Sequence, residues 1–209
     1  MIDVAQQINA VRRWVGTRVL EAGEARVITI SQTYDTEPDD LWDACTNATW
    51  IARWFLPVTG ELRLGGRYQL EANASGTVER CDPPKSFFAT WEYGDGISWI
   101  DVRVVPESDG RARFELEHIA HVEDGVWAEY GPGAVGVGWD MGLLGLAGHL
   151  SGTPLVEPGA AATAWQSSDE GHEFSRLSSE RWYEASVAAG EDEQAARAAA
   201  DRTTAAYTA

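Results

Sequence analysis

An apolar stretch at residues 133–150, GAVGVGWDMGLLGLAGHL, constrains the fold of this chain more than any other segment. At 100° per residue its large side chains fall within one sector of about 80°, which predicts a helix with one buried face. These side chains belong to Val135, Trp139, Leu143, Leu146 and Leu150. The flank of this face carries Gly138, Gly142 and Gly145, so a close approach or an empty space must offset the cost of glycine in a helix. We therefore expect a central helix that a sheet wraps around.

The length and composition limit the class of protein. A chain of 209 residues can bury a sizeable core, and this length favours one domain with appendages over two domains. A hydrophobic fraction of 44% and ten tryptophans exclude a disordered chain. The formal net charge of −17 opposes binding to nucleic acid and to anionic membrane surfaces, because both carry negative charge. We therefore expect a partner that is neutral, apolar or basic.

The N-terminal residues and the cysteines bear on location and metal binding. The sequence MIDVAQQINAVRRW carries charges where a signal peptide needs an apolar run, so we expect a cytoplasmic protein. The central apolar stretch is short, glycine-rich and interrupted by Asp140, so we expect no membrane span. Cys45 and Cys81 lack the spacing of metal ligands, and we interpret them as small core residues. The sequence assigns no metal ion and no cofactor.

The first third of the chain predicts short helices around a β-hairpin. Residues 3–15 have helical spacing of apolar residues after a capping box, and Gly16 ends this helix. Two β-prone runs at residues 17–21 and 26–34 are joined by a hairpin-like junction. A helix begins at Pro38, and Leu41 and Cys45, with Trp42 as a further candidate, form its buried side. A second short helix at residues 50–55 is capped by Thr49 and stopped by Pro57.

From residue 61 to residue 119 the hydrophobic period changes to two. Short turn-forming segments separate five strand-length runs, at residues 66–72, 76–82, 86–93, 97–105 and 111–119. Connections this short predict an antiparallel meander. Apolar residues alternate with charged ones along the runs, so one face of the sheet is solvated and the other is covered. Since no second set of strands is available, we expect the central helix to cover it.

The C-terminal residues predict a linker followed by a helical hairpin. Residues 153–164 are rich in Pro, Gly and Ala, which is typical of a linker. A helical pattern then runs to Gly190, and residues 192–207 form a second, alanine-rich helix. A narrow apolar seam of Phe174, Leu177 and Trp182 would pack either on the main domain or on a second copy of the chain. An exposed seam would make the C-terminal helices a homodimer interface.

Several segments resemble a known family. They are TYDTEPDDLWDACT, TWIARWF, LRLGGRYQLEA, GTVERCDPPKSFFATWEYG, SWIDVRV and RFELEHIAH, in that order. Together they look like the family named after the activator of the heat-shock protein 90 ATPase, in the START-like (SRPBCC) superfamily. The resemblance covers about residues 25–151, and it leaves outside an N-terminal helix and strand extension (1–24) and the linker with its hairpin (152–209). It implies an α+β helix-grip fold, in which a curved antiparallel sheet grips one long helix.

The resemblance also implies an apolar cavity between the sheet and the helix. Proteins that look like this include carriers of lipids or aromatic ligands, polyketide cyclases and aromatases, and co-chaperones. Our first hypothesis is therefore a binder of a small hydrophobic or aromatic molecule, with a cyclase- or aromatase-like enzyme and a co-chaperone-like interaction module as alternatives. The predicted ligand-binding residues are Trp50, Trp54, Phe55, Tyr68, Leu70, Arg80, Trp91, His118, Trp139 and Leu143. The alternative is that these side chains fill the core and leave no cavity.

Arg80 and His118 are the polar residues that we expect on the concave face. Arg80 shares strand parity with Val78, and His118 shares it with Leu116. Arg80 could hold a ligand carboxylate or enolate, and His118 could donate to a carbonyl or carry a proton. A purely structural interpretation pairs Arg80 with an acid such as Glu92 and makes His118 a core histidine bonded to the backbone.

Other motifs in the chain give weaker signals. His118 and His121 have helical metal spacing but lie at a strand end, where they point to opposite faces. Residues 131–136 match a dinucleotide-binding string, yet no βαβ unit surrounds them, so we interpret them as the start of the central helix. Asp140 lies about 100° from the centre of the predicted buried face, which argues against a catalytic carboxylate there. No residue is assigned a catalytic role.

Overall fold

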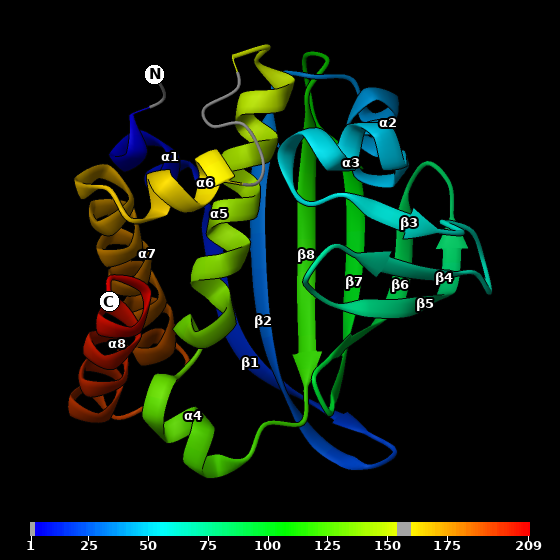
Figure 1. The fold of residues 1–209 in the computed structure, drawn as a ribbon. Helices are drawn as coiled ribbons and strands as arrows, with labels where there is room; N and C mark the ends of the chain where they lie inside the picture. The colour runs from blue at the N-terminus through cyan, green and yellow to red at the C-terminus, as the bar shows by residue number, and fades with distance from the viewer. Residues whose placement is uncertain (1–2, 154–159) are drawn as a thin grey trace.

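The structure of the protein is a computed structural model that describes residues 3–153 and 160–209. It has the predicted α+β helix-grip fold: one curved antiparallel sheet wraps around the long helix α5 (Gly133–Leu150) (Figure 1). The strands are β1 (Arg12–Leu20), β2 (Gly23–Tyr34), β3 (Val58–Gly60), β4 (Arg67–Leu70), β5 (Ser75–Asp82), β6 (Ser86–Tyr93), β7 (Gly96–Pro106) and β8 (Ala112–Ala120). The other helices are α1 (Val4–Ala10), α2 (Pro38–Thr46), α3 (Ala48–Trp54), α4 (Asp124–Tyr130), α6 (Ala160–Gln166), α7 (Asp169–Ala188) and α8 (Glu193–Tyr207).

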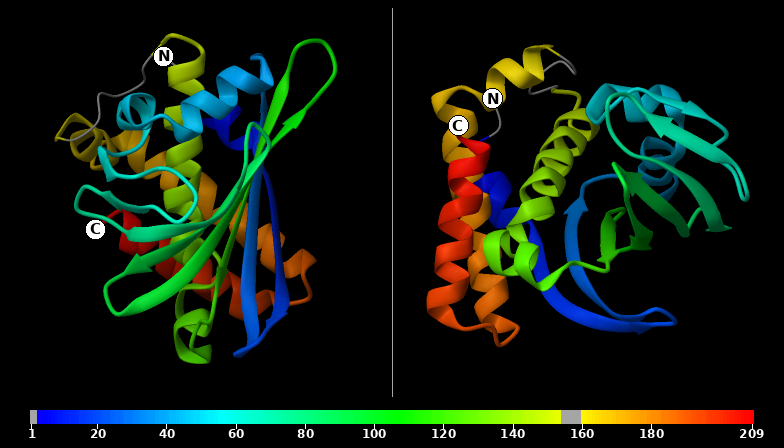
Figure 2. Two further views of the ribbon diagram at one scale, coloured as in Figure 1. Left: turned by 90° about the vertical axis from the view of Figure 1, so that its right-hand side faces the viewer. Right: turned by 60° about the horizontal axis from the view of Figure 1, so that its bottom comes forward.

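The sheet contains eight strands in the order β1-β2-β8-β7-β6-β5-β4-β3, all paired antiparallel. The five strands of the predicted meander are present, and the alternation predicted from the sequence is clear in β8. There Phe114, Leu116 and His118 are buried on the concave side, whereas Arg113 and Glu115 lie on the other face. Figure 2 shows how the sheet curves, so that its concave face receives α5, α2 and α3.

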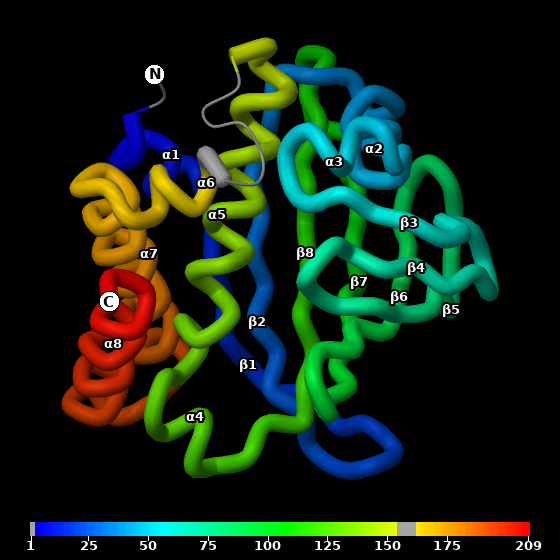
Figure 3. Tube along the Cα trace, in the orientation of Figure 1, coloured from blue at the N-terminus to red at the C-terminus, as the bar shows by residue number. Residues whose placement is uncertain are grey.

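Helix α5 has the predicted bounds, but more than one face of the helix is buried. Leu143 and Leu146 are buried as predicted, whereas Val135 is 43% exposed and does not meet the strands. Val137 and Asp140, outside the predicted sector, are buried. The reason is that a second layer of helices, α7 and α8, packs on the side of α5 that faces away from the sheet (Figure 3). An amphipathic pattern cannot describe a helix that is packed on two sides.

The glycines of α5 receive neighbouring parts of the chain. A Cβ atom at Gly136 would lie 2.3 Å from the Trp182 ring, and one at Gly145 would lie 2.1 Å from the backbone oxygen of Trp54. At Gly142 the nearest atoms of Phe55 are 3.6 Å away. The glycines therefore allow α7 to approach one part of the helix and α3 to approach another.

The N-terminal region differs from the prediction of a helix over residues 3–15. Helix α1 ends at Ala10, and β1 begins at Arg12 and pairs with β2 along its whole length. Val15 of β1 and Val11, which has an extended backbone between α1 and β1, are both buried in the core. Their spacing of four residues fits a helical face and also one face of a strand, so spacing alone could not decide between them.

Smaller differences concern caps and short elements. Asn47, rather than Thr49, caps α3, because its side chain accepts the hydrogen bond of the Thr49 backbone N–H. The short elements β3 and α4 were not predicted. Helix α6 lies partly within the predicted linker at residues 153–164, and residues 154–159 of that linker are outside the described residues.

The C-terminal hairpin docks on the main domain of its own chain. Phe174 and Trp182 of the predicted seam are 0% and 1% exposed in the single chain, and Leu177 is partly buried. Helices α5 and α1 and strand β1 already cover α7. The exposed seam on which the predicted homodimer depended is therefore absent from the described residues. The predicted docking on the main domain is the alternative that the structure contains.

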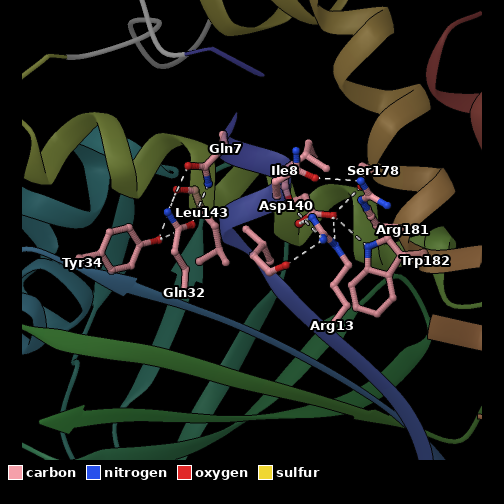
Figure 4. A network of polar contacts seen from close by, with 12 residues as sticks. Gln7, Ile8, Arg13, Gln32, Tyr34, Asp140, Leu143, Ser178, Arg181 and Trp182 are labelled. Atoms are coloured by element: carbon pink, nitrogen blue, oxygen red, sulfur yellow. Dashed lines mark hydrogen bonds and ion pairs between the residues drawn. The ribbon is translucent and has the colours of Figure 1, made fainter. Parts of the chain in front are cut away.

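A buried carboxylate joins the three layers (Figure 4). Both oxygens of Asp140 accept hydrogen bonds from Arg13, at 2.7 Å and 3.0 Å. Ser178 Oγ and Trp182 Nε1 of α7 donate to Asp140 Oδ2 at 2.5 Å and 3.0 Å. Burial raises the pKa of Asp140, and its contacts with Arg13, Ser178 and Trp182 oppose that rise. The network connects α5 to the sheet through Arg13 and to the hairpin through Ser178 and Trp182. Its two charged residues, Arg13 and Asp140, are far apart in sequence.

Candidate functional site

A pocket of about 250 Å³ lies between the concave face of the sheet and helices α2 and α3. Its floor comes from β5 to β8, and one wall comes from β3, β4 and the segment between them. Helix α5 contributes Trp139. The lining residues are Trp42, Cys45, Thr46, Ile51, Trp54, Phe55, Val58, Leu62, Tyr68, Leu70, Val78, Cys81, Pro83, Phe87, Ala89, Trp91, Ile100, Val102, Phe114, Leu116 and Trp139. The walls are therefore mainly apolar and aromatic.

Strand β6 sets the length of the floor. Phe87, Ala89 and Trp91 alternate onto the concave face, and all three line the pocket. Phe87 and Trp91 are four residues apart, which places them about 13 Å apart along an extended strand. Ala89 lies between them and is paired with Val78 and Ile100 on the neighbouring strands. Ala89 is thus a small residue between two aromatic ones, and it is 1% exposed.

Aromatic side chains gather at both ends of this floor. Near Trp91, the ring of Phe55 is stacked on Trp139 at a centroid distance of 6.0 Å, and Trp91 meets Trp139 at 5.0 Å. Near Phe87, the ring of Trp42 makes an edge contact at 6.2 Å. Such rings present flat apolar surfaces with preferred offset or edge geometries. The pocket can therefore hold a flat apolar molecule between aromatic contacts.

Most polar atoms of the pocket wall already have partners within the protein. Tyr68 Oη donates to the Thr90 carbonyl oxygen at 2.6 Å, and Trp54 Nε1 donates to the Ala44 carbonyl oxygen at 2.9 Å. Thr46 Oγ1 donates to the Trp42 carbonyl oxygen at 2.7 Å. Burial raises the pKa of Tyr68 and of the Cys45 thiol, so both groups are protonated near neutral pH. Among the described lining residues there is no charged side chain.

His118 lies behind the pocket wall in a chain of hydrogen bonds. Trp139 Nε1 donates to His118 Nδ1 at 2.9 Å, which leaves the ring proton on Nε2, 2.8 Å from Ser98 Oγ. Ser98 Oγ in turn donates to the Trp91 carbonyl oxygen at 3.0 Å. Burial lowers the pKa of His118 to about 4, so the ring is neutral near pH 7. The histidine therefore holds Trp139 and is itself absent from the lining.

The structure brings six of the ten predicted ligand-binding residues to the pocket. These six are Trp54, Phe55, Tyr68, Leu70, Trp91 and Trp139. His118 and Leu143 are buried nearby but do not line it. Trp50 does not line the pocket. Its ring centroid is 5.7 Å from that of His149, and the guanidinium carbon of Arg53 lies 4.3 Å from the Trp50 ring centroid. Whether the six residues bind a ligand stays a prediction.

The placement of Arg80 on the concave face is wrong. The pairing of β5 with β6 shifts register between Val78 and Arg80, and this irregularity breaks the strand parity on which the prediction depended. The Arg80 side chain is 68% exposed, 3.7 Å from Asp101 and over the ring of Phe88 at 4.2 Å. Glu92, the suggested partner of Arg80, instead pairs with Arg67 at 2.9 Å. Beyond the bulge, Cys81 takes the inward position and lines the pocket.

Several lining residues were not predicted, although the sequence contains a signal for one of them. Phe87 has the same strand parity as Trp91 on β6, so strand alternation applied to the predicted Trp91 would also have predicted Phe87. Trp42 and Cys45 were considered only as the buried side of α2. Their place in the pocket wall depends on how α2 crosses the sheet, which no local pattern encodes.

Two further findings concern metal binding and membrane crossing. The described residues contain no group of three or more His, Cys, Asp or Glu side chains that could hold a metal ion. No helix in the described part of the chain is long and apolar enough to cross a membrane.

Comparisons with known proteins match the chain at the levels of sequence and structure. The model of the family described as "Activator of Hsp90 ATPase homolog 1-like protein" matches residues 35–151. No curated protein matches the chain. The crystal structure of CalU16 from Micromonospora echinospora is 34% identical, has a TM-score of 0.67, and is matched over 84% of this chain and 98% of that one. For the solution structure of CalU16 these values are 34%, 0.69, 87% and 97%.

A more distant structure shares the fold only. DynU16, described as a putative protein in the dynemicin biosynthetic locus, is 15% identical with a TM-score of 0.55, over 61% of this chain and 48% of that one. The match to CalU16 covers 87% of this chain and therefore extends beyond residues 35–151, which the family model matches.

Proposed function

The chain belongs to the family of Activator of Hsp90 ATPase homolog 1-like proteins, and on that premise we propose that it binds a small apolar or aromatic molecule between the sheet and the helices. One observation carries the proposal: a pocket of about 250 Å³ with mainly apolar and aromatic walls penetrates the helix-grip core. Ligand sites in proteins are typically concave and apolar, with a few polar groups that orient the ligand.

The energetics favour occupation of such a pocket by an apolar molecule. Each square ångström of apolar surface removed from water contributes about 25 cal/mol to binding, before the entropic cost of association is subtracted. Aromatic walls add offset and edge contacts for a flat ligand. The wall rings already contact one another at both ends of the floor, so the protein loses little side-chain freedom when the ligand enters.

The same geometry does not support an enzymatic mechanism in which Arg80 and His118 orient and protonate a substrate. Arg80 is on the outer face, and His118 donates its Nε2 proton to Ser98 while Nδ1 accepts from Trp139. Neither ring nitrogen of His118 is left for a substrate. The co-chaperone-like role rests on the family description alone and stays a prediction.

The test is to fill the pocket by a substitution. Ala89→Phe adds a ring to the middle of the floor, whereas Thr17→Phe adds the same ring at an exposed position of β1 as the matched control. Native mass spectrometry of protein purified without detergent, with a thermal-shift screen of apolar and aromatic compounds, should find compounds that bind the unchanged protein and the Thr17→Phe variant. They should bind Ala89→Phe at least about tenfold more weakly. Compounds that bind all three proteins equally would place binding elsewhere and overturn the proposal.

A further inference from the structure

The pocket walls specify the kind of molecule that fits, and this inference rests on the proposed function. We infer that the ligand is a neutral, flat aromatic molecule that carries a hydrogen-bond acceptor, of the aromatic ketone class, and that carboxylates are rejected. Three features of the pocket support this inference: its lack of charge, the hydrogen bonds that its polar groups already make, and two indole groups that make none.

The absence of charge among the described lining residues excludes an ionised ligand. A carboxylate in this pocket would lose its hydration without gaining a cationic partner, and such desolvation is strongly unfavourable. Arg80, the cation that the sequence placed inside, lies on the opposite face of the sheet beside Asp101. The net charge of −17 further disfavours an anionic ligand through the field of the whole protein.

The hydrogen bonds within the wall occupy most of its donors. The hydroxyl protons of Tyr68 and Thr46 and the indole protons of Trp54 and Trp139 all go to acceptors of the protein. Releasing any of these donors to a ligand would break a buried hydrogen bond, so they do not favour one ligand over another.

Two lining indoles differ from the others. The Nε1–H groups of Trp42 and Trp91, in the pocket wall, donate to no residue in the described part of the chain, and neither nitrogen is among its buried unsatisfied atoms, so solvent reaches both. Trp42 belongs to the cluster near Phe87, and Trp91 to the cluster near Trp139. Each end of the floor thus has an indole donor that lacks a protein partner. A ligand acceptor such as a carbonyl oxygen can replace the water at an indole donor, whereas a hydrocarbon that covers the donor displaces the water and leaves the N–H unsatisfied.

The shape of the pocket favours a fused-ring molecule. Ala89, in the middle of the floor, is flanked by aromatic residues about 13 Å apart along β6. A flat system of two or three rings spans this distance in contact with both ends, and its carbonyl oxygen can approach one of the indole donors. An aromatic ketone therefore combines all three requirements.

A ligand series that changes one property at a time tests the inference. Fluorene, 9-fluorenone and 9-fluorenone-2-carboxylate share one ring system and differ in the carbonyl group and the charge. Calorimetric titration of the full-length protein into each compound should give tightest binding for fluorenone. Binding of fluorene should be about fivefold weaker for the loss of one hydrogen bond, and binding of the carboxylate should be more than about tenfold weaker.

Variants assign the acceptor contact. Trp42→Phe and Trp91→Phe remove the N–H and keep a ring, and at least one of them should weaken fluorenone binding to the level of fluorene without changing fluorene binding. Trp14→Phe, at an exposed indole outside the pocket, is the control and should change neither. If fluorene binds the unchanged protein as tightly as fluorenone, or the carboxylate binds most tightly, the inference is overturned while the proposed function stands. If none of the three compounds binds, the inference is overturned, and the compound screen with the Ala89→Phe variant decides on the proposed function.

Discussion

At the scale of single residues, the carboxylate of Asp140 depends on Arg13 for charge compensation. The Arg13 and Asp140 side chains are 3% and 0% exposed. Removing one partner of such a pair leaves an uncompensated buried charge, which costs about 3–5 kcal/mol, whereas replacing both partners by apolar residues is often close to neutral. We therefore expect Arg13→Met to lower the free energy of unfolding by about 3–5 kcal/mol, measured by urea denaturation.

Two further variants complete that experiment. Arg13→Met combined with Asp140→Leu should be less destabilised than Arg13→Met alone, because no unpaired charge remains. Arg176→Met, which breaks an exposed pair with Glu173 on α7, should change stability by less than about 0.5 kcal/mol. Equal losses for the buried and the exposed arginine would contradict this account of the network.

His118 makes stability depend on pH in a defined window. Its pKa is about 4 in the folded protein and about 6.5 in an unfolded chain, so between these values the unfolded state binds more protons. The free energy of unfolding should therefore fall as the pH is lowered from about 6.5 to about 4, by roughly 3 kcal/mol from this residue. Above pH 6.5 its contribution is constant.

The comparison of wild type with His118→Gln isolates this effect from other titrating groups. The variant should be less stable at pH 7, and the difference from wild type should narrow on acidification across that window, as measured by urea denaturation at each pH. His121→Gln, at an exposed histidine just beyond the same strand, is the control for the replacement of an imidazole by an amide. A gap between wild type and His118→Gln that stays constant from pH 7 to pH 4 would argue against a neutral, buried His118.

At the scale of elements, the approach of α3 to α5 can be tested with glycines of one helix. A Cβ atom at Gly145 would lie 2.1 Å from the Trp54 carbonyl oxygen, a backbone atom that cannot turn aside. At Gly138 the nearest neighbour is Tyr207 Oη at 3.6 Å, an ordinary contact. Alanine also gains about 1 kcal/mol over glycine in a helix.

We therefore expect Gly145→Ala to destabilise the protein by about 1–3 kcal/mol, because α3 must move. It should also weaken binding in the pocket, since Trp54 and Phe55 line it. Gly138→Ala should be neutral or stabilising by up to about 1 kcal/mol. Thermal unfolding and ligand titration of both variants measure these effects, and a reversed order of the two stabilities would contradict the close approach in the structure.

At the scale of the whole molecule, the C-terminal hairpin completes the core of the main domain. Its Trp182 and Ser178 bind Asp140, and Phe174 packs with Ile8 and Leu144. A chain that ends after Gly152 would expose this surface and lose two hydrogen bonds of a buried charge. We expect it to unfold at a much lower temperature than the full chain, or without a cooperative transition, in circular dichroism. Removal of Thr208 and Ala209 alone, beyond α8, is the control and should leave the transition unchanged. A truncated chain that kept the full-length transition would contradict an integral role for the hairpin.

The sequence by itself determined most of the elements and the fold class. The period of two in the meander, the long apolar stretch at Gly133–Leu150 and the family motifs each gave an element that the structure contains. These features are local, and the alternation of side chains along a strand follows from backbone geometry alone. Local parity also placed Leu116 and His118 correctly on the buried face of β8.

Only the tertiary structure decided which side chains meet. A single bulge after Val78 reversed the face of Arg80, because one inserted residue shifts strand parity without any sign in the local pattern. Asp140 was set aside as off the buried face, yet it is the charge on which β1, α5 and α7 converge, since its partners at positions 13, 178 and 182 are brought together only by packing. The pocket likewise depends on the crossing of α2 and α3 over the sheet. Contacts between residues far apart in sequence determine all three features, and no short window of the sequence contains them.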